Sequence, residues 1–196
     1  MKYGAWWQSC QPSFYNQIFE EFRTLHNEFI DWVKSKDIKS ILEVGCGTGH
    51  YGEIFADKRY FGNDISKSAI EEARKKDENP RHNYRSSDFI QDTSFTKWSF
   101  DLVFAHSVID HVYDIDGFLE KCIKKTLRYV WITAYLRPHE GQHHIMNWQS
   151  DGYYFNNLSI PEMEATLGKF NVRYTMDDFE YDKNKDKAFV ILIERI

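Results

Sequence analysis

The chain has 196 residues, of which 42 % are hydrophobic and 28 % are charged, and its formal net charge is −5. A chain of this size and composition can fold as one globular domain with a sizeable core. The acidic balance argues against a nucleic-acid partner, because nucleic-acid-binding surfaces are usually basic. The sequence has no apolar leader of signal-peptide type, no apolar run that could cross a membrane, and no disulfide or zinc pattern among its three cysteines. We therefore expect a cytoplasmic protein without membrane or nucleic-acid partners.

The N-terminal part of the chain is aromatic and then helical in pattern. Residues 1–12 could form a flap over a pocket or a loose end pinned to the core. Residues 13–34 repeat apolar side chains at helical spacing, with Ser13 as the expected cap. We therefore expect residues 1–36 to form an N-terminal helical cap segment and residues 37–196 the main domain, within one structural unit.

The most informative stretch is an apolar strand followed by three glycines at alternate positions, Gly45, Gly47 and Gly49. A glycine turn at the carboxyl end of a strand lets the backbone approach a ligand closely. The string from Gly47 to Gly52 matches the dinucleotide pattern, but the first glycine of that pattern should follow the strand directly, as only Gly45 does. Glu43, near the strand end, is placed to accept a hydrogen bond from a ligand ammonium. A nucleotide with a cationic amino-acid tail therefore suits this turn better than a pyrophosphate.

The segment E-V-G-C-G-T-G at positions 43–49 resembles motif I of the class I S-adenosylmethionine-dependent methyltransferases. The resemblance implies that the cofactor is S-adenosyl-L-methionine and that its methionine part is held by this segment. The residues carried over are Glu43, Gly45, Cys46, Gly47 and Gly49.

Asp64 ends the second predicted strand, about 20 residues after the glycine turn. A carboxylate at this point can accept both ribose hydroxyls of a nucleoside. Asp64 could instead cap the following helix, but Ser66 or Ser68 can do that, so we favour the ribose. Asp64 and Ile65, with the helix after them, also resemble motif II of the same family.

Three further cofactor contacts are expected, and the first two follow from the resemblance. Family members have an acid after the third strand that binds the adenine amino group, with the next residue stacking nearby, and the matching positions are Asp88 and Phe89. Without the resemblance, a lone Asp at this point would be read as a turn residue. His106 ends the fourth strand, where it would touch the methionine tail.

The order of elements predicts an α/β fold, a single Rossmann-like three-layer domain. We expect a mostly parallel seven-stranded sheet with an antiparallel C-terminal hairpin strand and an N-terminal helix. Ser159 should cap the last helix, and residues 182–186 should form the turn of the terminal hairpin. Residues 137–154 read as a long polar connection of the kind that is usually functional or mobile.

A sulfonium methyl group is already activated, so the enzyme must align the acceptor with it and exclude water. A hydroxyl acceptor also needs a base, and histidine is the usual one near neutral pH. Both ligands should lie where the parallel strands end, beside the loops after strands four and five. We expect His111 to be the base, with His143 and His144 as second candidates. Asp110 could contribute instead, although neighbours on a helix face different sides.

Other chemistries remain open. A divalent ion could orient a diol acceptor, with ligands among the residues His106, Asp110, His111, Glu140, His143 and His144, but no spacing among them is specific, and we expect no metal. A non-catalytic cofactor-binding module would keep Glu43 and Asp64 without needing a base. A nicotinamide-dependent oxidoreductase is opposed by the glycine register and by the lack of a Tyr-x-x-x-Lys pair.

Two sequence motifs are absent after the fourth strand, and their absence limits the chemical class of the methyl acceptor. Resembling enzymes that act on planar amines carry an Asn/Asp-Pro-Pro-aromatic sequence there, and those that attack pyrimidine C6 use Pro-Cys; neither occurs here. We therefore expect O-methylation of a small hydroxylated acceptor, such as a sugar or a secondary metabolite. The sequence does not predict the oligomeric state.

Overall fold

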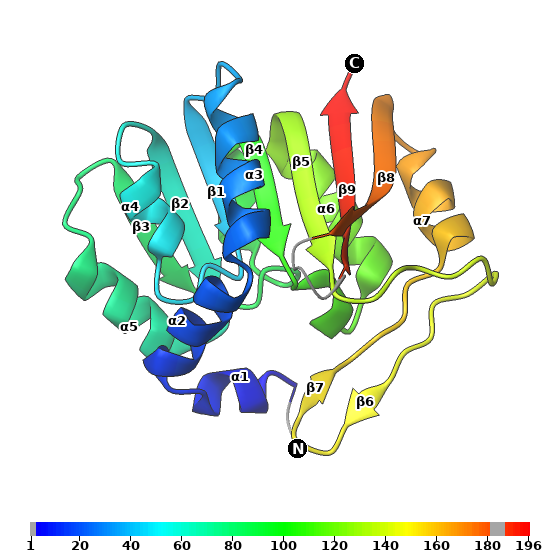
Figure 1. Ribbon diagram of the computed structural model, residues 1–196, viewed down its shortest axis with the longest axis horizontal. Helices are drawn as coiled ribbons and strands as arrows, with labels where there is room; N and C mark the ends of the chain where they lie inside the picture. Colours follow the sequence, from blue (N-terminus) through cyan, green and yellow to red (C-terminus); the bar gives the residue numbers. More distant parts are fainter. Residues whose placement is uncertain (1–2, 181–186) are drawn as a thin grey trace.

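The computed structural model describes residues 3–180 and 187–196 of the chain. A seven-stranded sheet runs through its middle in the order β3-β2-β1-β4-β5-β9-β8 (Figure 1). Strands β1 to β5 are parallel, and β9 is antiparallel to both of its neighbours. The bounds of the strands are β1 (Ser40–Val44), β2 (Arg59–Asp64), β3 (His82–Ser86), β4 (Phe100–His106), β5 (Thr126–Ala134), β8 (Val172–Glu180) and β9 (Lys187–Arg195). The predicted fold class is confirmed.

Helices cover both faces of this sheet and complete three layers. Helices α3, α4 and α5 pack on one face, and α6 and α7 pack on the other (Figure 1). Their bounds are α1 (Ala5–Ser9), α2 (Pro12–Glu21), α3 (Arg23–Lys34), α4 (His50–Ile54), α5 (Lys67–Lys76), α6 (Ile115–Lys125) and α7 (Ile160–Leu167), with short 3-10 turns η1 (Thr93–Lys97) and η2 (Ile109–His111).

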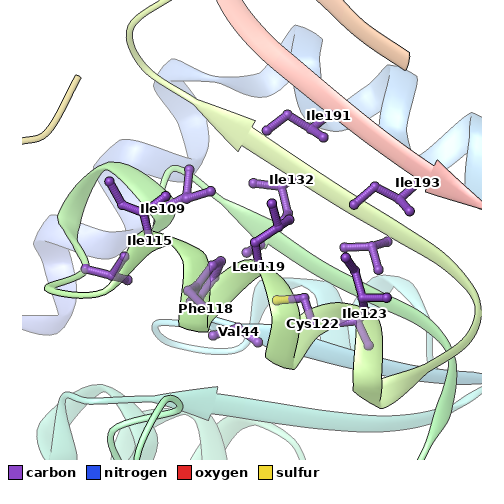
Figure 2. Close-up of a cluster of buried hydrophobic side chains, with 14 of the residues drawn as sticks. Val44, Ile109, Ile115, Phe118, Leu119, Cys122, Ile123, Ile132, Ile191 and Ile193 are labelled. Atoms are coloured by element: carbon purple, nitrogen blue, oxygen red, sulfur yellow. The ribbon is translucent and has the colours of Figure 1, made fainter. Parts of the chain in front are cut away.

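The side chains of strand β1 pack into the hydrophobic cores on both faces of the sheet. All five of its residues are buried, as expected for a parallel strand covered on both faces. Ile41 belongs to the core under α3, whereas Leu42 and Val44 belong to the core under α6. Figure 2 shows the second core, in which side chains of α6 such as Phe118 and Leu119 lie against those of β5 and β9.

The N-terminal helix differs from the prediction. Residues 13–34 were expected to be one helix, but α2 and α3 are separate and meet at Phe22, which has φ −99° and ψ 20°. The break lets the buried Phe22 ring and the apolar sides of both helices reach the core. The expected cap, Ser13, is already inside α2. Gln11 is the cap, and Pro12 occupies the first turn, where its missing N–H costs nothing. The division of the chain at residue 36 stays a prediction.

The connection after β5 contains a small hairpin that the sequence pattern did not predict. It is formed by β6 (Trp148–Gln149) and β7 (Tyr153–Tyr154), and it lies beyond the carboxyl ends of the parallel strands (Figure 1). Helix α1 lies beside it, and the Gly4 N–H donates to the Gly152 carbonyl at 2.9 Å. The two segments together form a roof over that end of the sheet. The predicted terminal turn, residues 182–186, lies outside the described residues.

The predicted start of α7 is confirmed, and it allows a stability test. The Ser159 hydroxyl accepts from the Glu162 N–H at 3.3 Å and donates to the Gly141 carbonyl, and the residue is fully buried. Ser159→Ala should therefore lower the free energy of unfolding by about 1–2 kcal/mol, measured by urea denaturation. Ser150→Ala, at an exposed serine, should stay within about 0.5 kcal/mol of the wild type. Equal stabilities of the two variants would contradict this role of the cap.

Candidate active site

The glycine turn after β1 is folded in a conformation that other residues rarely adopt. Gly45, Gly47 and Gly49 have φ values of 80°, 50° and 80°. A Cβ atom on Gly45 would lie 2.3 Å from Val108 Cγ2, and one on Gly47 would lie 2.9 Å from the Tyr15 ring. The turn therefore has close neighbours on both sides, and it brings bare backbone to the end of the sheet.

Asp64 joins this turn to the end of β2. Its Oδ2 accepts from the Gly47 N–H at 2.8 Å, and its Oδ1 accepts from the Ser66 N–H at 2.7 Å. Ser66, not Asp64, caps α5 by accepting from the Ala69 N–H. Burial raises the pKa of Asp64, and its backbone donors oppose the shift. Each carboxylate oxygen has a further lone pair for a ligand hydroxyl.

A large cavity opens at the carboxyl ends of β1, β2 and β4. Its empty volume, including space open to solvent, is about 830 Å³. It brings together most of the residues expected at the cofactor and acceptor: Gly45, Asp64, Ile65, Asp88, Phe89, His106 and His111. Residues from the N-terminal segment and β5 complete the lining: Tyr3, Trp7, Tyr15, Ile18 and Tyr135.

Glu43 faces a second, smaller pocket behind the glycine turn, which Cys46 and Gly47 also line. Glu43 is 4 % exposed, and its carboxylate accepts a hydrogen bond from the Tyr60 hydroxyl. Burial raises the pKa of Glu43 to about 8, although the Tyr60 donor acts in the opposite direction. His106 lines both pockets and so lies between them.

Asp88 and Phe89 lie on the β3 side of the large cavity. Asp88 Oδ1 accepts from the Ile90 N–H at 3.0 Å, which holds the loop in a tight turn. Phe89 is buried, and its ring centroid lies 5.8 Å from that of Phe118 in α6. Both residues line the cavity, so the geometry allows the adenine contacts that the resemblance implies.

His111 lies in the η2 turn and is held in a defined orientation. Its Nδ1 lies 2.8 Å from the Tyr154 carbonyl, so in the neutral ring Nδ1 is the donor and Nε2 is an acceptor. Burial lowers the pKa of His111 to about 4, and the Tyr154 carbonyl acts in the opposite direction. The rings of Trp7 and Tyr135 lie 4.9 Å and 6.0 Å from it, centroid to centroid.

Asp110 is not among the residues that line the cavity. It is fully buried, its Oδ2 accepts from the Tyr135 N–H at 3.0 Å, and its carbonyl accepts from the Asn156 N–H. Burial raises the pKa of Asp110 to about 7. The carboxyl group therefore ties the η2 turn to the end of β5, and the structure does not bring this predicted catalytic residue to the cavity.

His143 and His144 lie at the start of α7 and line neither pocket. His143 Nδ1 lies 2.9 Å from Glu162 Oε1, and His144 Nδ1 accepts from the Ser159 N–H at 2.8 Å. The loop after β5 runs towards α7 before it returns as the β6–β7 hairpin (Figure 1). These two histidines, expected as second candidates for the base, are therefore placed away from the cavity.

Several lining residues escaped the sequence analysis. Trp7 and Tyr15 reach the cavity from the N-terminal segment, and the Tyr15 hydroxyl donates to the Trp7 carbonyl at 2.9 Å. The flap considered for residues 1–12 agrees with the position of Trp7, whereas no sequence pattern indicated Tyr15. His26 and Tyr51 line the second pocket, and nothing in their spacing pointed there. Within residues 3–180 and 187–196, no group of three or more His, Cys, Asp or Glu side chains is arranged to hold a metal ion.

A family model described as a methyltransferase domain matches residues 42–128. The match runs from β1 into β5 and contains the glycine turn, Asp64, Asp88 and His111. The predicted resemblance to the class I S-adenosylmethionine-dependent methyltransferases is confirmed over these residues. The methyl donor of this methyltransferase is S-adenosyl-L-methionine, as predicted.

Individual relatives of the methyltransferase are distant. A ubiquinone biosynthesis O-methyltransferase from Mesorhizobium japonicum is 26 % identical, over 79 % of this chain and 72 % of that protein. A methyltransferase solved with the Haloferax volcanii activator Trm112 has a TM-score of 0.69 at 14 % identity, covering 91 % of each chain. Magnesium protoporphyrin IX methyltransferase from Synechocystis, solved with S-adenosylhomocysteine, has a TM-score of 0.64 at 14 % identity, over 91 % of this chain and 87 % of that one. These two structures share the fold of the methyltransferase.

The described helices of the methyltransferase include none with the length and apolar content that a membrane span requires.

Proposed function

We propose that this methyltransferase transfers the methyl group to a hydroxyl oxygen of a small acceptor, with His111 as the general base. In this reaction Nε2 of His111 takes the hydroxyl proton while the acceptor oxygen bonds to the methyl carbon and S-adenosylhomocysteine is released. The orientation of His111 carries the proposal. Its Nδ1 is committed to the Tyr154 carbonyl, so the remaining nitrogen is an acceptor on a ring that lines the cavity.

The residues of the cavity suit the cofactor. We assign the ribose hydroxyls to Asp64, the adenine amino group to Asp88, the stacking contact to Phe89, and the tail ammonium to Glu43. Backbone of the glycine turn would lie along the methionine part, as the positive φ values and the close Val108 and Tyr15 neighbours suit. The bound cofactor supplies an electrophilic methyl group, and the surrounding chain orients the acceptor and excludes water.

The walls around His111 suit a small uncharged acceptor with a flat or apolar body. Trp7, Tyr135 and Val108 lie on the acceptor side, and the residues that the structure shows lining this cavity include no Lys or Arg. Aromatic rings can stack on an aromatic acceptor or on the apolar face of a sugar. The distant relative whose name specifies O-methylation supports oxygen as the methylated atom.

Replacement of His111 tests the proposal directly. His111→Gln should slow methyl transfer by ~10²-fold or more while leaving the affinity for S-adenosylhomocysteine unchanged, because the base acts only on the acceptor. Burial lowers the pKa of His111 to about 4, so the ring is neutral above that pH. The acid limb of kcat/KM should therefore lie near pH 4 to 5, well below the ordinary histidine value of about 6.5.

The rate is measured as methyl ether formation over a panel of hydroxylated acceptors. His143→Gln is the matched control, because its exposed ring lies at α7, and its rate should equal that of the wild type. An unchanged rate of methyl transfer in His111→Gln would contradict the assignment of His111 as the general base. Cofactor binding without transfer to any hydroxyl of the panel would overturn the proposed O-methylation.

A further inference from the structure

The second pocket contains two histidine nitrogens that have no partner in the described structure. His26 lies in α3 and His106 at the end of β4, and their rings meet edge to face with centroids 5.2 Å apart. The Nε2 atom of each ring is buried and makes no hydrogen bond within the described residues. A buried polar atom without a partner is costly, and natural proteins keep few of them. Both residues line the pocket, so a ligand there can satisfy both atoms.

The neighbours of His26 decide which of its nitrogens carries the hydrogen. The Tyr51 hydroxyl is hydrogen-bonded to His26 Nδ1. Burial raises the pKa of Tyr51 well above its usual value, so the phenol keeps its proton and can donate it. Because this donation makes Nδ1 the acceptor, Nε2 of the neutral ring carries the N–H. His26 therefore offers the pocket a donor.

The same reasoning applies to His106. Its Nδ1 lies 3.3 Å from Thr133 Oγ1, and that hydroxyl oxygen already accepts from the Ser107 N–H at 3.0 Å. The hydroxyl hydrogen is therefore free to point at His106 Nδ1, which leaves the N–H on Nε2. Two buried N–H groups thus belong to one pocket, an arrangement that suits an anion.

Glu43 gives the same pocket a carboxylate, which the Tyr60 hydroxyl holds in place. A carboxylate and a pair of N–H donors complement a zwitterionic α-amino acid, whose ammonium and carboxylate lie on one carbon. The amino-acid tail of the cofactor is such a group. The pocket adjoins the glycine turn through Gly45 and Gly47, where the tail is expected to lie.

We propose that His26 and His106 bind the carboxylate of the cofactor's amino-acid tail, and that one of the two imidazoles takes up a proton when it binds. The inference rests on the cofactor of the proposed function and is independent of the acceptor. The lining residues that the structure describes include no Lys or Arg, so an imidazolium is the available protein cation. The other titratable groups that line this pocket are Tyr15, Glu43, Cys46, His50 and Tyr51.

Proton uptake follows from the change in surroundings. Burial lowers the pKa of His26 to about 4 and that of His106 well below its usual value, so both rings are neutral near pH 7. A carboxylate beside them favours the charged ring and raises its pKa. Binding therefore becomes tighter as pH falls through the range between the pKa of the free ring and that of the complexed ring.

The test compares two ligands by isothermal titration calorimetry in buffers of different ionisation enthalpy. One is S-adenosylhomocysteine, and the other is its analogue without the carboxylate. Both carry the ammonium, so any proton exchanged at Glu43 is common to both and cancels in the difference. The wild type should bind S-adenosylhomocysteine about 10- to 100-fold more tightly than the analogue, with additional proton uptake.

Three variants test which residues cause the preference for S-adenosylhomocysteine over the analogue without the carboxylate. His26→Gln should reduce the preference to a few-fold and remove most of the additional proton uptake. Tyr51→Phe keeps the aromatic ring at position 51 but removes the hydroxyl that orients His26, so this variant should also reduce the preference. His143→Gln is the control, because its exposed ring contacts Glu162 and lines neither pocket. This control should keep the wild-type preference.

Equal affinity of the wild type for the two ligands, or an unchanged preference in both His26→Gln and Tyr51→Phe, would overturn the inference. Either result would leave the proposed O-methylation standing, because that is scored separately by methyl ether formation. If the carboxylate preference is present but no methyl ether forms, the proposed function fails and the carboxylate site stands.

Discussion

Replacing Asp64 by Ala is expected to weaken binding of S-adenosylhomocysteine by about 10²-fold or more. The carboxylate is assigned to two ribose hydroxyls, and each hydrogen bond to a charged group is worth about 1.5–3 kcal/mol. The variant also loses the contacts to the Gly47 and Ser66 N–H groups, which hold the glycine turn against the end of β2. Asp64→Asn keeps one amide oxygen as an acceptor, so its loss should be smaller, about 10-fold.

Calorimetry with S-adenosylhomocysteine gives the affinities, and thermal unfolding without ligand shows whether each variant is folded. Asp57→Ala is the control, because that side chain is 77 % exposed and its contact is with the neighbouring Lys58. A folded Asp64→Ala protein that binds within a few-fold of the wild type would contradict the ribose assignment.

Replacing Asp110 by Asn is expected to make the stability of the protein less dependent on pH. Burial raises the pKa of Asp110 to about 7, whereas the unfolded value is about 3.9. The folded state therefore favours the protonated carboxyl, and the stability that this preference contributes is complete below pH 4. It is lost progressively as pH rises to about 7, to a total on the order of 4 kcal/mol. The side-chain amide of the Asp110→Asn variant does not titrate, and its oxygen can still accept from the Tyr135 N–H.

The measurement is urea denaturation of both proteins between pH 4 and pH 8. The difference between their free energies of unfolding at each pH reports the contribution of Asp110, because other titrating groups such as Glu43 are common to both proteins. The stability of Asp110→Asn relative to the wild type should increase across this range and level off above pH 7. The variant should also retain methyl transfer to within a few-fold, since Asp110 is not at the cavity surface. A difference that does not change with pH, or a loss of transfer like that expected for His111→Gln, would contradict this structural role.

The features predicted correctly are those encoded over short distances along the chain. The glycine turn and the strand before it are adjacent in sequence, so their register, together with Glu43, favoured a nucleotide with a cationic amino-acid tail over a pyrophosphate ligand. The resemblance of the same stretch then implied S-adenosyl-L-methionine. The alternation of apolar strands and amphipathic helices likewise determined the sheet and its reversed strand. The cap at Ser159 was predicted because its partner, Glu162, is three residues away.

The features that were missed depend on contacts between distant parts of the chain. No glycine or proline marks the helix break at Phe22, which follows from packing against the core. His143 and His144 were expected near the acceptor, but contacts with Glu162 and Ser159 hold them at α7. His26 joins the second pocket only because α3 packs beside β4, and no spacing rule links a residue in one element to a site in the other.

The roof over the cavity joins the two most widely separated parts of the site, through the bond from Gly4 to Gly152 and the packing of Trp6 on Tyr153. Contacts between such distant segments close only after nearer ones have formed, because their loop-closure entropy is large. During synthesis the ribosome must therefore complete all strands from β1 to β5 and the connection that follows before the first helix can dock. The N-terminal residues are made first, and we expect them to be among the last to dock.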